Sequence, residues 1–165
     1  MVADLLSRPR AAGEPVEHAP PPARPRPPLL RVPGWPERLA DLIANEQRAP
    51  FVWGCHDCAT LAIDVVRMIT GADLGIGLPA WPTRRDAMRA LAAAGARSAS
   101  EFFDIHLPTI EPASARRGDL VACGEPADPL CCPAVLAGAS AHSRNEAGWV
   151  VLPRHLVTRA WQVGA

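Results

Sequence analysis

The chain has 165 residues, of which 48% are hydrophobic and 21% charged, and this size predicts one globular core. Lys plus Arg and Asp plus Glu balance at 17 each, which argues against nucleic acid or an acidic membrane surface as a partner. No run approaches the roughly 20 apolar residues of a membrane span, and the first residues lack the apolar region of an export signal, so we expect synthesis and folding in the cytoplasm.

The first segment, residues 1–33, is dominated by proline, alanine, arginine and glutamate, with HAPPPARPRPPLLRVP at its centre. Such a run lacks the apolar periodicity that would offset the entropy of ordering it. We therefore expect a disordered, extended tail over residues 1–33 and a single domain over residues 34–165.

Two helices are expected at the start of the domain. Apolar residues recur at helical spacing from Trp35 and predict a helix that ends before Pro50. A second helix is predicted over residues 57–70, with Asp57 as its N-cap, because its apolar residues share one face and Gly71 follows at the position where helices often end.

Two more helices follow in the sequence. The third begins near Thr83, which forms a capping pair with Asp86, and it stops at Gly95. The residues expected on its inward face are Met88, Leu91 and Ala92. A short fourth helix is predicted over residues 100–106.

The sequence changes to strand character after Pro112. The β-rich runs are GDLVACG, CPAVLAG, SAHSR, GWVVLPR and TRAWQVG, separated by turn residues. Helices followed by an antiparallel meander predict an α+β domain with the helices packed on one side of the sheet.

A candidate nucleophile stands in FVWGCHDCATLAIDVVRMITG, which places Cys58 at the first turn of the second helix. The unpaired amides and the positive end of the helix dipole at that turn favour a thiolate over a thiol. The apolar helix face holds the sulfur in a fixed position, as nucleophilic catalysis requires.

This stretch, followed by ARRGDLVAC and CPAVLAG, resembles the NlpC-like cell-wall cysteine peptidases of the papain-like superfamily. It is most similar to short phage and prophage proteins that share a Trp-Gly-x-His-Asp-Cys motif, an RRGDLV-like strand and an Ala-Trp pair near the C-terminus. The matching residues are Trp53, Gly54, His56, Asp57, Cys58, Arg117, Gly118, Asp119 and Trp161. The resemblance implies a papain-like α+β fold and, if the site is active, a cysteine peptidase or amidase that needs no cofactor. The partners it implies are peptidoglycan peptide stems and phage tail proteins, with association with the virion.

The sequence departs from the family at the general base. When CPAVLAG is aligned with the family's catalytic strand, Cys132 stands where the histidine belongs. A thiol cannot replace an imidazole at neutral pH, and loss of a general base costs roughly 10²–10⁴-fold in rate. His142, near the position of the residue that orients the family's histidine, and His56, two residues before Cys58, are alternative bases. The competing interpretation is a degenerate, non-catalytic structural or interaction module of a phage tail tip.

The five cysteines leave two further alternatives open. Cys55 and Cys58 form a Cys-x-x-Cys at a helix start, as in thiol–disulfide exchange, although no βαβ pattern surrounds them. Cys55, Cys58, Cys132 and His142 also form a plausible set of zinc ligands.

Overall fold

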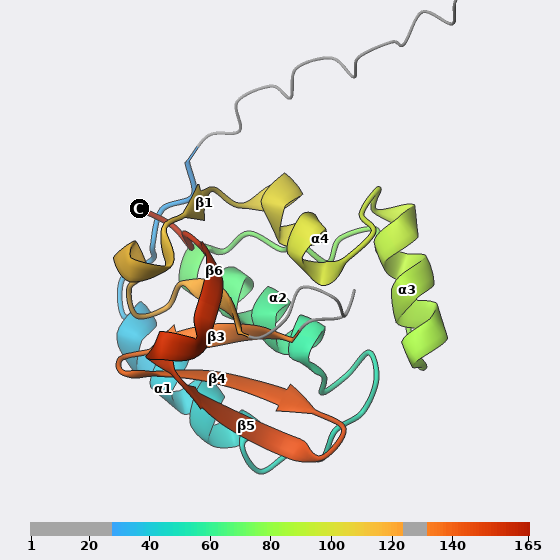
Figure 1. Cartoon of the computed structure of the whole chain (residues 1–165), viewed down its shortest axis with the longest axis horizontal. Helices are drawn as coiled ribbons and strands as arrows, with labels where there is room; N and C mark the ends of the chain where they lie inside the picture. The colour runs from blue at the N-terminus through green and yellow to red at the C-terminus, as the bar shows by residue number, and fades with distance from the viewer. Residues whose placement is uncertain (1–27, 124–131) are drawn as a thin grey trace, which may run out of the picture.

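A computed structural model describes residues 28–123 and 132–165 (Figure 1). The helices within these residues are α1 (Trp35–Glu46), α2 (Cys58–Thr70), α3 (Arg84–Ala93) and α4 (Ala99–His106). The strands are β1 (Thr109–Ile110), β2 (Leu120–Cys123), β3 (Pro133–Ala137), β4 (Ser140–Asn145), β5 (Gly148–Pro153) and β6 (Val157–Trp161). In these two ranges no helix combines the length and the apolar character needed to cross a membrane.

The six strands form one antiparallel sheet in the order β1-β6-β2-β3-β4-β5. Strands β2 to β5 form the expected meander. The expectation is wrong for β6, which returns across the sheet to pair with β2 and receives the unpredicted β1 on its other side. A two-residue strand has no periodicity to detect, and the return of β6 depends on tertiary pairing that local patterns do not encode.

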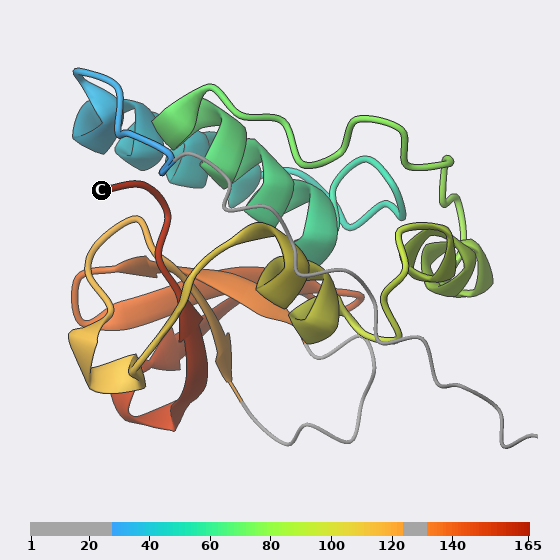
Figure 2. The same cartoon turned by 90° about the horizontal axis from the view of Figure 1, so that it is seen from above.

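The helices α1 and α2 cover one face of the sheet, as Figure 2 shows, so the expected α+β class is confirmed. The core between these layers is formed by the apolar face of α2 and by inward side chains of the sheet. Its fully buried members include Leu39, Val65, Val66, Ile69, Leu120 and Val135. This packing holds the first turn of α2 in a fixed place beside the sheet.

The third helix buries a different face from the one expected. Ala87 and Ala90 are buried, Met88 and Leu91 are partly buried, and Ala92 is exposed. The helix therefore packs through its smallest side chains. Its predicted start is confirmed, because Thr83 accepts a hydrogen bond from the amide of Asp86 at 3.2 Å.

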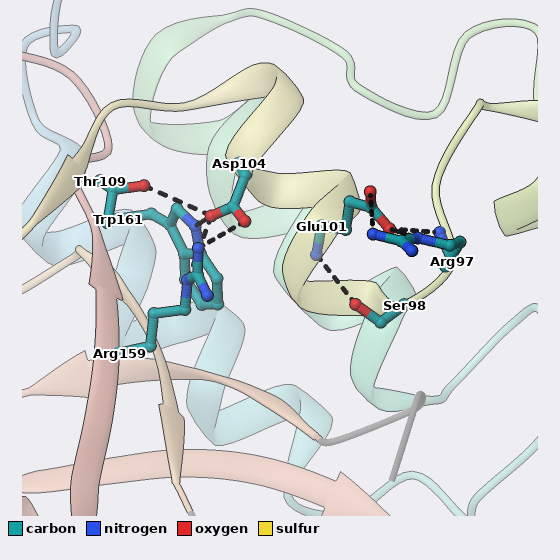
Figure 3. A network of polar contacts seen from close by, with 7 residues as sticks. All are labelled: Arg97, Ser98, Glu101, Asp104, Thr109, Arg159 and Trp161. Atoms are coloured by element: carbon teal, nitrogen blue, oxygen red, sulfur yellow. Dashed lines mark hydrogen bonds and ion pairs between the residues drawn. The ribbon is translucent and has the colours of Figure 1, made fainter. Parts of the chain in front are cut away.

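The fourth helix is tied to the sheet through its carboxylate Asp104 (Figure 3). The buried Trp161 donates its indole N–H to Asp104 at 2.8 Å, and the guanidinium of Arg159 binds the same carboxylate. Trp161 and Arg159 thus anchor α4 onto β6.

Residues 28–33, which were expected to belong to the tail, contact the domain. The guanidinium of Arg31 lies 2.7 Å from the buried carboxylate of Asp119 and stacks on the ring of Trp35 at 4.5 Å. The amide of Val32 donates to the carbonyl of Ile69 at 2.8 Å. The docked part of the chain therefore begins before residue 34, and the rest of the expected tail, residues 1–27, lies outside the described residues.

Candidate functional site

The Trp-Gly-x-His-Asp-Cys motif forms a tight turn that leads into α2. Gly54 has a φ of +72°, and a Cβ at this position would lie 3.0 Å from the carbonyl oxygen of Trp81, so the turn requires glycine. The turn directs the carboxylate of Asp57 toward three N–H donors. Oδ1 accepts from the amide of Thr60 at 2.8 Å, and Oδ2 accepts from the amide of Gly54 at 2.6 Å and the indole of Trp81 at 2.7 Å.

Asp57 is therefore the N-cap of α2, as predicted, and it is only 1% exposed. Thr60 completes a capping box, because its hydroxyl accepts from the amide of Asp57 at 2.9 Å. With the cap, the turn and the core all in place, the next residue, Cys58, occupies the first helical position of α2.

The thiol of Cys58 forms a side-chain hydrogen bond with the thiol of Cys132, the residue just before β3. Cys132 itself donates to the carbonyl oxygen of Arg144 on β4 at 3.1 Å. Because Cys132 gives its proton to this carbonyl, its sulfur is the acceptor for the Cys58 S–H. The structure thus brings together the two cysteines that the sequence placed at the nucleophile and general-base positions.

The pKa of Cys58 is raised well above its ordinary value, contrary to the expectation of a stabilised thiolate. The largest cause is the hydrogen bond to Cys132, which favours the protonated thiol, and burial acts in the same direction. The negative charges that Cys132 and Asp57 carry when ionised raise it further, whereas the backbone amide at the helix start lowers it. The helix terminus is outweighed, and Cys58 is a protonated thiol at neutral pH.

His142 lies on β4 opposite Val135 of β3 and faces α1. It lines a groove of about 360 Å³ with Ala40 and Gln47, and its Nε2 lies 3.0 Å from the hydroxyl of Ser140. Its Nδ1 is buried with no hydrogen-bond partner among the described residues, and burial lowers the pKa of the ring. The imidazole predicted as a possible base is thus held in a groove other than the one that Cys58 lines.

The contacts that position His56 come from the turn and from α1, and none that is described comes from the Cys58 thiol. Its backbone pairs with that of Val52, and its Nδ1 lies 3.3 Å from the carboxylate of Glu46 at the end of α1. The same Glu46 oxygen lies 3.1 Å from the guanidinium of Arg144, whose side chain is 1% exposed. Glu46 thus holds the second candidate base and a buried arginine together.

Two hollows reach Cys58. A groove of about 340 Å³ is lined by both thiols, the aromatic rings of Phe51 and Trp53, and Arg144. None of the described residues that line this groove is a histidine. A smaller apolar cavity of about 50 Å³ is also lined by Cys58, together with residues of α2, α3 and α4, and Trp53 and Trp81 form part of its wall.

The zinc ligand set predicted as an alternative does not assemble. Cys55 is exposed on the turn, and within residues 28–123 and 132–165 no group of three His, Cys, Asp or Glu side chains could hold a metal ion. Cys58 and Cys132 contact each other, but His142 lines a different groove. The described residues therefore offer two of the four expected ligands side by side.

The residues of the Arg-Arg-Gly-Asp motif stabilise the fold. The buried Asp119 accepts hydrogen bonds from the amides of Arg116 and Val163 and from the Arg31 guanidinium. Arg117 donates to the carbonyl of Pro36 at 3.0 Å. These residues join the N-terminal segment, the start of β2 and the C-terminal strand, and they do not line the Cys58 groove.

Sequence reasoning missed two residues of the site. Trp81 holds the carboxylate of Asp57, and Arg144 accepts the Cys132 hydrogen bond on its backbone and lies buried beside Glu46. Trp81 falls in a loop with no local motif. Arg144 carried no local signal either, because the strand around it, SAHSRN, is mostly polar and does not indicate that the arginine is buried.

Residues 30–163 match the model of a protein family described as a domain of unknown function, DUF6950. No curated protein matches the chain. The family match covers both the Trp-Gly-x-His-Asp-Cys turn and the strand β3 that follows Cys132.

Proposed function

We propose that this chain, which belongs to the DUF6950 family, is a papain-like domain of NlpC type that has lost its general base and binds peptide segments without cleaving them. The observation that supports this most directly is the neighbour of Cys58. Its thiol donates to a second thiol, Cys132, in a groove whose described lining contains no histidine. Among the described residues, the groove retains the position of a nucleophile and holds no imidazole that would activate it.

The chemistry of amide cleavage explains why this arrangement should not hydrolyse a peptide. The nucleophile must be a thiolate when it attacks the carbonyl, and a base must later donate a proton to the leaving amine. Cys58 has a raised pKa and is hydrogen bonded in its protonated form. Cys132 has its own proton engaged with the Arg144 carbonyl, so it is poorly placed to accept another.

The groove is suited to hold an extended peptide. Phe51 and Trp53 meet edge to face at 5.0 Å and form an apolar wall, and the thiols lie on the same surface. Aromatic side chains bury large apolar area when they pack against a ligand. From the resemblance to cell-wall peptidases we propose a peptidoglycan peptide stem as the ligand, and from the resemblance to phage and prophage proteins we propose that the domain acts in a phage tail.

The proposal is tested with the full chain and a synthetic peptidoglycan stem peptide, with binding measured by calorimetry and cleavage by mass spectrometry. We expect binding, no cleavage, and the same affinity in Cys58→Ala. Phe51→Ala should weaken binding, whereas Ile76→Ala, at an 80% exposed position that does not line the groove, should not. Cleavage that disappears in Cys58→Ala would refute the loss of activity, and failure to bind would refute the ligand.

A further inference from the structure

We infer that Cys58 and Cys132 form a reversible disulfide, so that the thiol at the first turn of α2 is a redox modification site. The two residues come from distant parts of the sequence, yet their thiols share a hydrogen bond. Both residues also line one groove, so their sulfurs face the same space, and a disulfide requires them to come to about 2.05 Å. This inference does not rest on the proposed function, because it requires neither a peptide ligand nor an inactive site.

The backbone around Cys132 can make this approach without breaking the sheet. Cys132 precedes β3, whose first residue, Pro133, has no backbone N–H to donate to the ladder. On the other side, Cys58 is held by α2 and its cap. Cys132 therefore moves toward a fixed partner, and the bond costs its hydrogen bond to the Arg144 carbonyl.

The pairing differs from the one that the Cys-x-x-Cys spacing suggests. Cys55 is exposed on the turn, where its amide donates to the carbonyl of Val52 at 3.1 Å. The Cys58 side chain instead contacts Cys132, which also lines the same groove. The groove gives a small molecule access to both sulfurs, so the partner of Cys58 is selected by tertiary structure.

The oxidant is a low-molecular-weight disulfide. The raised pKa keeps most of Cys58 protonated and slows this step, so it is the ionised fraction that attacks one sulfur of that disulfide. An S–S bond breaks, and one small thiol leaves. The Cys132 thiolate then attacks the Cys58 sulfur of the mixed disulfide and releases the second small thiol. Two electrons pass from the cysteine pair to the small disulfide, the two protons of the cysteines end on the two small thiols, and a reducing thiol reverses both steps.

The product would alter the groove and the stability of the domain. Both sulfurs at the groove surface would be joined, which removes Cys58 from any reaction with an electrophile. The link would also connect the start of α2 to the chain before β3 and close a long loop, which stabilises a folded chain by restricting its unfolded state. We expect the midpoint of thermal unfolding to rise by several degrees on oxidation and to fall back when the protein is reduced.

The test equilibrates the full chain with mixtures of oxidised and reduced glutathione, quenches in acid, alkylates the remaining thiols and maps tryptic peptides by mass spectrometry. We expect a link between the peptide that contains Cys58 and the peptide that contains Cys132. Each peptide holds further cysteines, so single substitutions locate the bond. Cys58→Ser and Cys132→Ser should abolish it, and Cys55→Ser, Cys123→Ser and Cys131→Ser should leave it intact.

Several results would overturn the inference. One is a disulfide within the peptide that holds Cys55 and Cys58. Others are a stable glutathione adduct on Cys58 with no link to Cys132, or a link that survives Cys132→Ser. Fragmentation of the linked wild-type peptides assigns the two sulfurs without any substitution, so a variant that folds poorly does not leave the inference untested.

Discussion

The carboxylate of Asp57 accepts a 2.7 Å hydrogen bond from the indole nitrogen of Trp81, which lies in the loop before α3. This contact joins the start of α2 to a segment that no motif connects with it. Asp57 is also the helix cap and holds the Gly54 turn, so one buried carboxylate sets the position of Cys58.

Loss of this contact should destabilise the domain. Trp81→Phe keeps the apolar ring and removes the donor, and we expect a loss of about 1–2 kcal/mol in the free energy of unfolding. Asp57→Asn should cost more, about 2–4 kcal/mol. Both carboxylate oxygens of Asp57 accept hydrogen bonds from N–H donors, and the side-chain NH2 group of asparagine would replace one of these acceptors with a donor. The measurement is urea denaturation followed by circular dichroism.

The matched control is Thr83→Ala, which removes the exposed cap of α3 and should cost about 0.5–1 kcal/mol. If Asp57→Asn is no more destabilising than Thr83→Ala, the buried carboxylate does not organise the turn as we describe.

The motif glycine should be more sensitive than a glycine with the same backbone angle elsewhere. Gly54 and Gly34 have φ values of +72° and +73°, but only Gly54 would bring a Cβ to 3.0 Å from another backbone, at the Trp81 carbonyl. Gly34→Ala should cost about 1 kcal/mol for the left-handed conformation alone, and Gly54→Ala about 1–3 kcal/mol more. Equal losses in chemical denaturation would show that the approach of Trp81 imposes no constraint.

The α2 region could be predicted almost completely from the sequence. Its start at Cys58, its cap Asp57 and its end at Gly71 are all local features, in which a capping residue, an apolar period and a glycine agree. The same holds for the first turn of α3. By contrast, β1 and the return of β6 to β2 depend on pairing between distant segments, which no local period encodes.

The candidate site likewise has one feature that the sequence could predict and one that it could not. The alignment of CPAVLAG predicted that Cys132 stands at the base position, and the structure puts its thiol against Cys58. The expectation that Cys58 is a thiolate is wrong. The helix terminus does lower the pKa of Cys58, but side chains that only the tertiary structure brings near the sulfur raise it more. Cys132 and the burial of the site raise the pKa, and neither contribution can be assigned from the helix sequence alone.

The burial of His142 predicts a loss of stability in acid. Desolvation lowers the pKa of this ring, so the folded state favours the neutral form. Its contribution to stability is therefore present above the ordinary histidine pKa of about 6.5 and is lost as the pH falls through and below that value. His142→Gln should reduce the dependence of unfolding free energy on pH between about 7 and 5. Val151→Gln, at the exposed position opposite His142 on β5, introduces the same amide without removing an imidazole and should leave the slope unchanged.

The final prediction tests the base position directly by returning an imidazole to it. Wild-type Cys58 should react slowly with iodoacetamide at pH 6. As long as the pH is below its raised pKa, the reaction rate should increase about tenfold for each unit by which the pH is increased, because only the thiolate reacts. Cys132→His removes the thiol that stabilises the protonated form and places a group that becomes an imidazolium beside Cys58. We expect labelling of Cys58 at pH 6 to increase by about tenfold or more.

Two controls separate the imidazole from the loss of the second thiol. Cys132→Ala removes the hydrogen bond to Cys58 without adding a positive charge, so it should increase labelling at pH 6 less than Cys132→His does. Cys58→Ala in the Cys132→His background should abolish the fast labelling, which assigns it to this sulfur. If Cys132→His labels no faster than Cys132→Ala, position 132 does not deliver an imidazole to Cys58. That result would count against the proposed relationship of this groove to a cysteine hydrolase site, whereas gain of peptide cleavage in Cys132→His would support it.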